Sequence, residues 1–313
     1  MSRKFKNNYP TKQIGLWTVL KWWIFGNRRQ WPKWVQNTYQ PQLPDKIEKQ
    51  QVAIIFINHA TCLIQTATAN ILTDPVWAKR ASPFSFMGPK RVRAPGLDFE
   101  KLPKIDCVLI SHNHYDHLDR ETLKKLQQRH RPVFVVPLKN EAIMKALGIT
   151  DCRVLNWWKH FELNEDIKIT MVPAQHFSGR GLTDRDTTLW GSYVIENKGM
   201  KVFFAGDTGY SPHFKEILER FGAMDVSLLP IGAYDPAYIM QPVHLNPEEA
   251  VRAHLDLKSK YSIAIHFGTF QLTDEGIDEP TQGLKAALAH AKMDPAQFRV
   301  LQEGETFIYQ QGV

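Results

Sequence analysis

Short apolar runs alternate with polar turns along most of the chain, from residue 51 onward. The runs are rich in β-branched and aromatic side chains and are shorter than an ordinary helix, which favours strands. Many such strands with helical stretches between them predict an α/β or α+β domain rather than a helical bundle or an all-β sandwich. The predicted strands are 52–57, 62–65, 70–73, 105–110, 133–136, 152–155, 167–172, 192–196, 200–205, 225–230 and 262–265.

Helix signals stand at three places between these strands. Asp119 can cap a helix whose apolar positions fall near helical spacing, and Arg131-Pro132 stops it. Two more helices are predicted over 139–147 and 247–255. Residues 82–96 combine prolines, glycines and basic side chains, so we expect a long loop that contacts substrate.

The first 50 residues differ from the rest, so we divide the chain into an amino-terminal arm (1–50) and a domain (51–313). The arm carries an apolar, tryptophan-rich run over 14–25. This run is far shorter than the ~20 residues that span a bilayer, and Lys21 interrupts it. The basic residues that flank the run are Arg3, Lys4, Lys6, Arg28, Arg29 and Lys33.

Clustered tryptophans with basic flanks are typical of a helix that lies in a membrane interface. The alternative is an arm that packs on the chain's own core or on a second subunit. The pattern favours neither, so peripheral membrane contact through residues 1–40 and a homodimer both stay open.

Composition and charge narrow the class of protein. With 313 residues, 43% of them hydrophobic, the chain can bury a substantial core. The net charge of +7 favours an anionic partner: a phosphorylated substrate, an acidic membrane surface or a nucleic acid. Three widely spaced cysteines beside apolar runs are typical of core residues in a reducing compartment. We therefore expect a cytoplasmic protein, with the inner membrane face as a peripheral location.

Candidate chemistry is concentrated directly after the predicted strand 105–110. His112, His114, Asp116 and His117 lie within six consecutive positions. Imidazole nitrogens and a carboxylate oxygen suit divalent zinc, and four such groups could not be buried this close together without a metal or extensive hydrogen bonding. The alternative is a solvated polar turn.

Three further residues share this position at the end of a strand. His176, Asp207 and His266 follow the predicted strands 167–172, 200–205 and 262–265 as His112 follows its own. Because sites are commonly built from loops at one edge of a sheet, we expect the four segments to converge.

The order of these elements resembles a known pattern. His-x-His-x-Asp-His, a lone His, an Asp in Gly-Asp-Thr-Gly and a last His after a strand are similar to the metallo-β-lactamase superfamily, from about residue 51 to the C-terminus. Within it the chain most resembles the N-acyl-phosphatidylethanolamine-hydrolysing phospholipase D family. The segments that carry this closer resemblance are 173–176, 203–210, 230–234, 246–251 and 264–270.

The resemblance implies a four-layer αββα sandwich with two zinc ions at the sheet edges. One zinc ion would be held by His112, His114 and His176, the other by Asp116, His117 and His266, with Asp207 bridging both. Each ion then keeps an open position for water or a substrate oxygen, and a zinc-bound water has a pKa of about 7.

The implied activity is that of a zinc-dependent phosphodiester hydrolase acting on a phospholipid. It would convert N-acyl-phosphatidylethanolamine to phosphatidic acid and an N-acylethanolamine, with Asp116 and His244 as catalytic residues and Asp116 also a ligand. A related hydrolase of a soluble lactone or small phosphodiester is the alternative enzyme, and a non-catalytic, metal-bound scaffold at a membrane is the alternative class. No nucleic-acid partner is expected, because the interval between Asp207 and His266 is too short for the inserted domain of the superfamily's nucleases.

Several residues have a plain structural interpretation beside a functional one. His59 matches the family pattern, yet a structural role in its turn is favoured. Trp157, Trp158 and Trp190 either line an acyl groove or belong to the core. The remaining histidines have no motif, and we interpret them as surface or helix-face residues: His130, His160, His213, His254 and His290.

Overall fold

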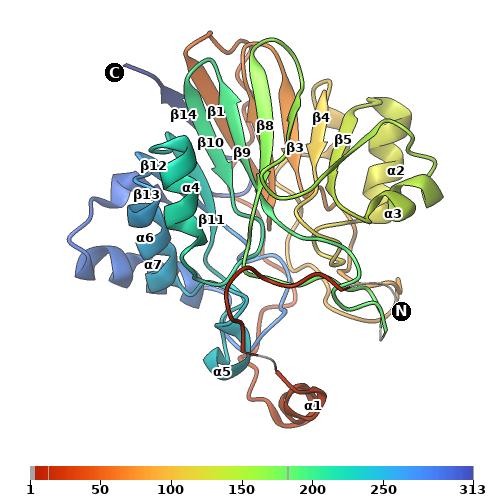
Figure 1. Cartoon of the computed structure of the whole chain (residues 1–313). Coiled ribbons are helices and arrows are strands. Elements are labelled where there is room, and N and C mark those ends of the chain that lie inside the picture. The colour runs from red at the N-terminus through yellow and green to blue at the C-terminus, as the bar shows by residue number, and fades with distance from the viewer. Residues whose placement is uncertain (1–3, 13, 182, 313) are drawn as a thin grey trace.

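The computed structural model describes residues 4–12, 14–181 and 183–312, so Arg3 of the basic flank lies outside the described residues. Two seven-stranded sheets face each other and carry helices on their outer faces (Figure 1). This confirms the predicted αββα sandwich.

The first sheet has the strand order β14-β1-β2-β3-β4-β5-β6. Its antiparallel half, from β14 to β3, gives way to parallel pairing from β3 to β6. Its strands are β1 Gln51–Asn58, β2 Thr61–Gln65, β3 Asn70–Thr73, β4 Cys107–Leu109, β5 Val133–Pro137, β6 Cys152–Leu155 and β14 Thr306–Gln310.

The second sheet has the order β13-β12-β11-β10-β9-β8-β7, parallel from β10 to β13 and antiparallel from β7 to β10. Within each sheet, therefore, the parallel strands run in the same direction and their carboxyl ends lie along the same edge. Its strands are β7 His160–Glu162, β8 Ile167–Val172, β9 Ser192–Asn197, β10 Met200–Phe204, β11 Val226–Pro230, β12 Tyr261–Ile265 and β13 Phe298–Arg299.

The helices form the two outer layers (Figure 1). Helices α2 and α3 lie beside β4 and β5, and α4, α6 and α7 lie beside β10 to β13. The helices are α1 Leu16–Phe25, α2 Arg120–Arg129, α3 Glu141–Ala146, α4 His213–Phe221, α5 Ala237–Met240, α6 Pro247–Asp256 and α7 Glu279–His290, with 3-10 turns η1 Phe99–Lys101 and η2 Pro295–Gln297.

Strand β1 shows why the layers assemble, because both of its faces are buried. Ile54 and Phe56 point into the core that continues into the second sheet. Ile55 and Ile57 point into the core beneath α2 and α3. The period-two alternation of a strand thus distributes one apolar run between two cores.

Local chemistry fixes the start of the helices nearest the strand ends. Asp119 accepts a hydrogen bond from Glu121 N at the start of α2, as the sequence predicts. At α6, Asn246 and Glu249 form a reciprocal capping box. Both caps lie only a few residues from predicted site residues, so they hold the intervening turns in place.

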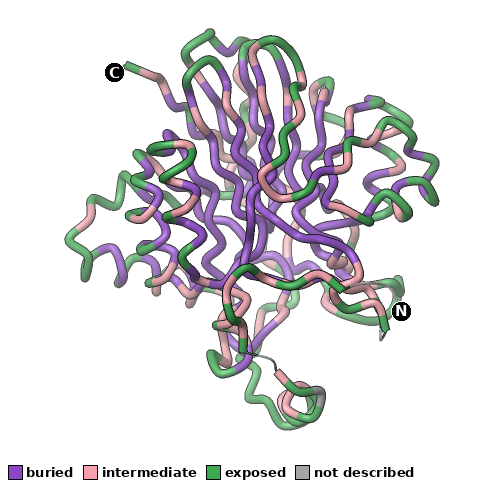
Figure 2. The backbone as a smooth tube through the Cα atoms, viewed as in Figure 1, coloured by how far each residue is buried: buried purple, intermediate pink, exposed green. Residues whose placement is uncertain are grey.

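The amino-terminal arm crosses below the strand ends, and α1 projects from it next to α5 (Figure 1). Much of α1 is exposed (Figure 2). Among its described large hydrophobic side chains, Trp17, Trp23 and Phe25 are the most exposed, at 76%, 67% and 80%. Among the described residues, no helix is long and apolar enough to cross a membrane.

Candidate metal centre

The four predicted segments meet at one edge of the sandwich. His112 follows β4 in the first sheet, whereas His176, Asp207 and His266 follow β8, β10 and β12 in the second. Each of these four side chains is buried. The site is therefore built where the two sheets face each other, on loops that begin at rigid strand ends.

One group of nitrogens comes from three histidines. His112 Nε2 lies 2.8 Å from His114 Nδ1, and His176 Nε2 lies 3.3 Å from the same atom. The three ligand atoms are all within 4.8 Å of one another, which suits a single divalent ion. These are the three residues that the sequence assigns to the first metal.

A second group lies beside it. His266 Nε2 and His117 Nε2 lie 3.5 Å and 3.4 Å from Asp116 Oδ2. Asp207 Oδ1 is 3.2 Å from His266 Nε2, while its Oδ2 is 3.2 Å from His117 Nε2. The structure thus brings together the residues assigned to the second metal.

Asp207 also reaches the first group. Its Oδ2 lies 3.9 Å from His112 Nε2 and 3.7 Å from His176 Nε2. Gly206 delivers it with a φ of 59°, and a Cβ there would lie 2.5 Å from Ser111 Cβ, so only glycine fits. The carboxylate stands between the two groups, in the position of a bridging ligand.

The electrostatics of the two groups differ. Burial lowers the pKa of His112 and His176 well below the usual value, so both imidazoles are neutral, as metal ligands require. At His117 and His266 burial opposes the charged form, but Asp207 and its neighbouring carboxylate outweigh burial and raise the pKa, to about 9 for His266. The site therefore attracts positive charge around Asp207.

The donor set fits a divalent cation. Among the described residues, His117 Nε2, His266 Nε2 and Asp207 Oδ1 are buried atoms without a hydrogen-bond partner. Buried polar atoms are normally paired, and these converge on one another in the arrangement that a metal ion would satisfy.

Asp74 supports the centre from behind, a role that the sequence analysis missed. Its Oδ2 accepts hydrogen bonds from His117 Nδ1 at 2.6 Å and from Ser111 Oγ, and its Oδ1 accepts one from Ser111 N. Such carboxylates fix the ring orientation of metal-binding histidines. The usable signal was that Asp74, too, directly follows a predicted strand.

His59 also acts behind the ligands. Its Nε2 lies 3.0 Å from Asp116 Oδ2, and its ring is 4.0 Å from that of His266. Asp74, His59 and His266 adopt positive φ values of 31°, 47° and 61°. Non-glycine residues rarely do so, and such strain is typical of functional sites.

His244 lies at the open side of the centre. Its Nδ1 is 3.9 Å from Asp207 Oδ2, and its ring is 5.1 Å from that of His176. Burial lowers its pKa to about 4, so the imidazole is neutral near pH 7 and can both donate and accept a hydrogen bond. The structure therefore places His244 beside the predicted ligands rather than on the surface.

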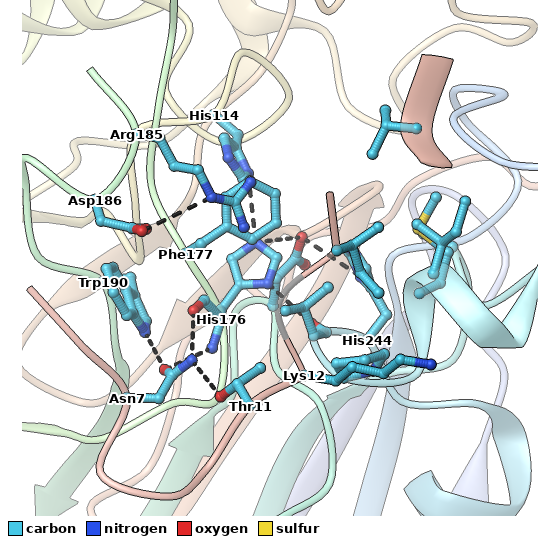
Figure 3. Close-up of a pocket in the computed structure, with 18 of the residues that line it drawn as sticks. Asn7, Thr11, Lys12, His114, His176, Phe177, Arg185, Asp186, Trp190 and His244 are labelled. Carbon is cyan, nitrogen blue, oxygen red and sulfur yellow. Dashed lines mark hydrogen bonds and ion pairs between the residues drawn. The ribbon is translucent and has the colours of Figure 1, made fainter. Parts of the chain in front are cut away.

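A pocket of about 980 Å³ opens onto this centre (Figure 3). His114, His176 and His244 form part of its floor. The rest of the lining is mixed: Lys4, Lys6, Lys12 and Arg185 are charged, whereas Phe5, Ile14, Val19, Trp22, Phe177, Ile239 and Met240 are apolar.

One expectation about the surroundings needs correction, and the structure bears on the two alternatives left open for the tryptophans. None of the residues 82–96 is among the described residues that line this pocket, so this loop does not meet the substrate there. Arg91 instead anchors the loop by donating to Ala78 O and Val76 O. Trp190 does line the pocket, whereas Trp157 and Trp158 pack against the core.

The interpretation of His130, His213 and His254 as surface or helix-face residues was wrong in one respect, since all three are buried. Each has a hydrogen-bond partner that makes burial possible. His130 Nδ1 accepts from Ile105 N, while His213 and His254 bond to Ser211 Oγ and Ser262 Oγ.

Comparison with known proteins decides the family. The family model for the beta-lactamase superfamily domain matches residues 69–267. The chain belongs to the metallo-β-lactamase superfamily. Membership implies a metal-dependent hydrolase fold, and the His and Asp clusters of this chain could hold the divalent metal.

Two relatives show how this superfamily member compares with curated proteins. An uncharacterized protein of Mycobacterium tuberculosis is 40% identical over 245 residues, which are 77% of this chain and 65% of that protein. The chain thus spans less than two thirds of that relative. The N-acyl-phosphatidylethanolamine-hydrolyzing phospholipase D 1 of Caenorhabditis elegans is 37% identical over 262 residues, 80% of this chain and 74% of that protein.

A solved structure supports the fold. The metallo hydrolase Igni18 from the archaeon Ignicoccus hospitalis superposes with a TM-score of 0.61. It covers 83% of this chain and 99% of its own at 22% identity. At this identity the likeness shows that the two proteins share the sandwich fold.

Proposed function

We propose that this protein is a dizinc phosphodiesterase of the phospholipase D type. It hydrolyses N-acyl-phosphatidylethanolamine to phosphatidic acid and an N-acylethanolamine. The observation that carries this proposal is the convergence of the seven residues His112, His114, Asp116, His117, His176, Asp207 and His266. Four of them, His114, Asp116, His176 and Asp207, line a large, partly apolar pocket. The 37% identity to the Caenorhabditis elegans phospholipase supports the choice of substrate.

The residues of the pocket have distinct tasks in this reaction. When bound, two divalent ions lower the pKa of a water molecule and offset the charge on the phosphoryl oxygens. His244 stands beside Asp207 on the open side, where its ring can donate a hydrogen bond to a phosphoryl oxygen. It can also accept a proton from the attacking water and then pass that proton to the departing alkoxide. Phe177 and Trp190 limit the access of bulk water from the side of His176.

The lining of the pocket suits a lipid. Ile14, Val19 and Trp22 come from the arm, and Ile239 and Met240 from α5. Together they offer apolar contacts on the side away from the predicted ligands, where acyl chains would leave water.

Hydrolysis assays separate this function from its alternatives. Zinc-loaded protein should cleave N-acyl-phosphatidylethanolamine in vesicles, lose this activity with a chelator and regain it when zinc is restored. A scaffold would cleave nothing. An enzyme for soluble substrates would hydrolyse a lactone or bis(p-nitrophenyl) phosphate and leave the vesicles intact.

We further propose that α1 meets the membrane that supplies this substrate. Trp22 faces inward and donates to Asp274 Oδ2, whereas Trp17, Trp23 and Phe25 are exposed. The helix stands next to the apolar part of the pocket, so a lipid could pass from the membrane interface to the site along it.

Replacing Trp17, Trp23 and Phe25 together by serine should weaken binding to anionic vesicles roughly tenfold or more, because burying each aromatic side chain is worth about 1.5–3 kcal/mol. Hydrolysis of bis(p-nitrophenyl) phosphate should stay unchanged. Vesicle sedimentation measures the first and absorbance the second.

The matched control replaces Leu255 and Ile308, which are also exposed but lie on α6 and β14. Their substitution by serine should leave vesicle binding intact. Unchanged vesicle binding in the α1 variant, with a change in oligomeric state, would assign this helix to a protein contact instead.

A further inference from the structure

Residues 4–12, which precede α1, have no regular secondary structure and lie against the candidate metal centre (Figure 3). The side chains of this segment alternate, as in a strand, between half-buried and exposed. The half-buried residues are Phe5, Asn7, Tyr9 and Thr11, and the exposed ones are Lys4, Lys6, Asn8, Pro10 and Lys12. One face of residues 4–12 therefore packs against the protein and the other faces solvent, although the sequence around these residues is mostly polar and basic.

Asn7 makes the closest connection to the predicted ligands. Its Oδ1 accepts hydrogen bonds from His176 N at 3.1 Å and from Trp190 Nε1 at 3.0 Å. Its Nδ2 donates to His176 O at 2.9 Å and to Thr11 Oγ1 at 2.9 Å. A carboxamide has two donor hydrogens and two acceptor lone pairs, so Asn7 uses its full capacity here.

The two hydrogen bonds from Asn7 hold the backbone of His176, and a separate contact holds its ring. His176 Nδ1 lies 2.8 Å from Val243 O, which leaves Nε2 to face His114 and Asp207. Val243 thus orients the imidazole, while Asn7 fixes the main chain on both sides of the same residue.

The segment also ties together the two ends of a long loop. Between β8 and β9, the described residues 173–181 and 183–191 form no helix or strand, and loops of this length are usually functional. Gln175 Nε2 donates to Thr11 Oγ1 at 2.7 Å near one end, and Phe5 N donates to Asp186 O at 2.8 Å near the other. The amino-terminal segment therefore holds the loop that carries His176 through hydrogen bonds near both of its ends.

We propose that Asn7 is a positioning residue of the metal centre. It holds the backbone of His176 so that this imidazole completes the group formed with His112 and His114. Groups that orient a metal ligand from behind typically change metal affinity by about 10- to 100-fold when they are removed. The proposal concerns metal binding alone, so it stands or falls separately from the lipid substrate.

The test measures zinc affinity without substrate. In Asn7→Ala, one of two zinc ions should be released to a competing chelator at about 10- to 100-fold lower chelator concentration than in the unchanged protein, and the other at the same concentration. Asn7→Asp keeps the two acceptor contacts at Oδ1, so its zinc affinity should lie between that of Asn7→Ala and that of the unchanged protein. It also serves if Asn7→Ala does not fold.

Asn164→Ala is the matched control, because Asn164 makes the same kind of contact at the other end of β8. Its Oδ1 accepts from Asp166 N and Ile167 N. This variant should lose thermal stability but keep both zinc affinities. If Asn7→Ala and Asn7→Asp hold both zinc ions within twofold of the unchanged protein, Asn7 has only a structural role and the proposal is wrong.

Discussion

Asp207→Ala should lose bound metal together with activity. Both oxygens of Asp207 lie among the predicted ligands, with Oδ1 3.2 Å from His266 Nε2 and Oδ2 3.2 Å from His117 Nε2. Without this carboxylate, two dications would face each other with no bridging anion. Because residues behind the ligands already change metal affinity by about 10- to 100-fold, we expect a larger loss here. Elemental analysis of the purified variant measures it.

Asp225→Asn provides the control for this variant. Asp225 is also buried, but it lies at the opposite end of the parallel strands, where it bonds Lys201 N and Tyr309 Oη. Its substitution should lower stability and leave the metal content unchanged. Two zinc ions per chain and near-normal turnover in Asp207→Ala would show that Asp207 does not bridge them.

His244→Gln should retain two zinc ions and lose catalytic rate. The ring is half-buried beside Asp207 and lines the pocket. Acid-base assistance by a positioned side chain typically contributes about 10²- to 10⁴-fold, which is the loss we expect in kcat. Steady-state kinetics on N-acyl-phosphatidylethanolamine and metal analysis of the same preparation test both statements.

The contrast with His266→Gln makes this result specific. His266 Nε2 lies 3.5 Å from Asp116 Oδ2 and 3.2 Å from Asp207 Oδ1, so its loss should remove metal as well as rate. Loss of one zinc ion from His244→Gln would place His244 among the ligands. Full activity of His244→Gln on phospholipid would show that His244 has no catalytic role.

The sequence predicts most strands and the meeting of the site segments because both depend on local patterns, whereas the four-layer sandwich followed from the family resemblance. Apolar runs of strand length define most strands, and the polar residues that end them mark one edge of each sheet. The structure brings His112, His176, Asp207 and His266 together as expected. Their roles as metal ligands stay predictions.

Other parts of the site depend on contacts between distant positions, which no local pattern records. Asn7 bonds to a residue 169 positions away, and its surroundings in the sequence are polar and basic. The role of Asp74 depends on its contact with His117, which lies 43 positions further along the chain. Helix α7 was not predicted either, because Gly283 lies within its first half and is unfavourable in a helix.

The most direct test of the proposed reaction follows the oxygen atom of water. Zinc-loaded protein acting on N-acyl-phosphatidylethanolamine in ¹⁸O-labelled water should release phosphatidic acid that carries the label in its phosphate and an N-acylethanolamine that carries none, and a chelator should abolish both products. This pattern requires attack at phosphorus with departure of the alcohol on the N-acylethanolamine side. Diacylglycerol as the product, label in the N-acylethanolamine, or undiminished hydrolysis in the presence of the chelator would contradict the account.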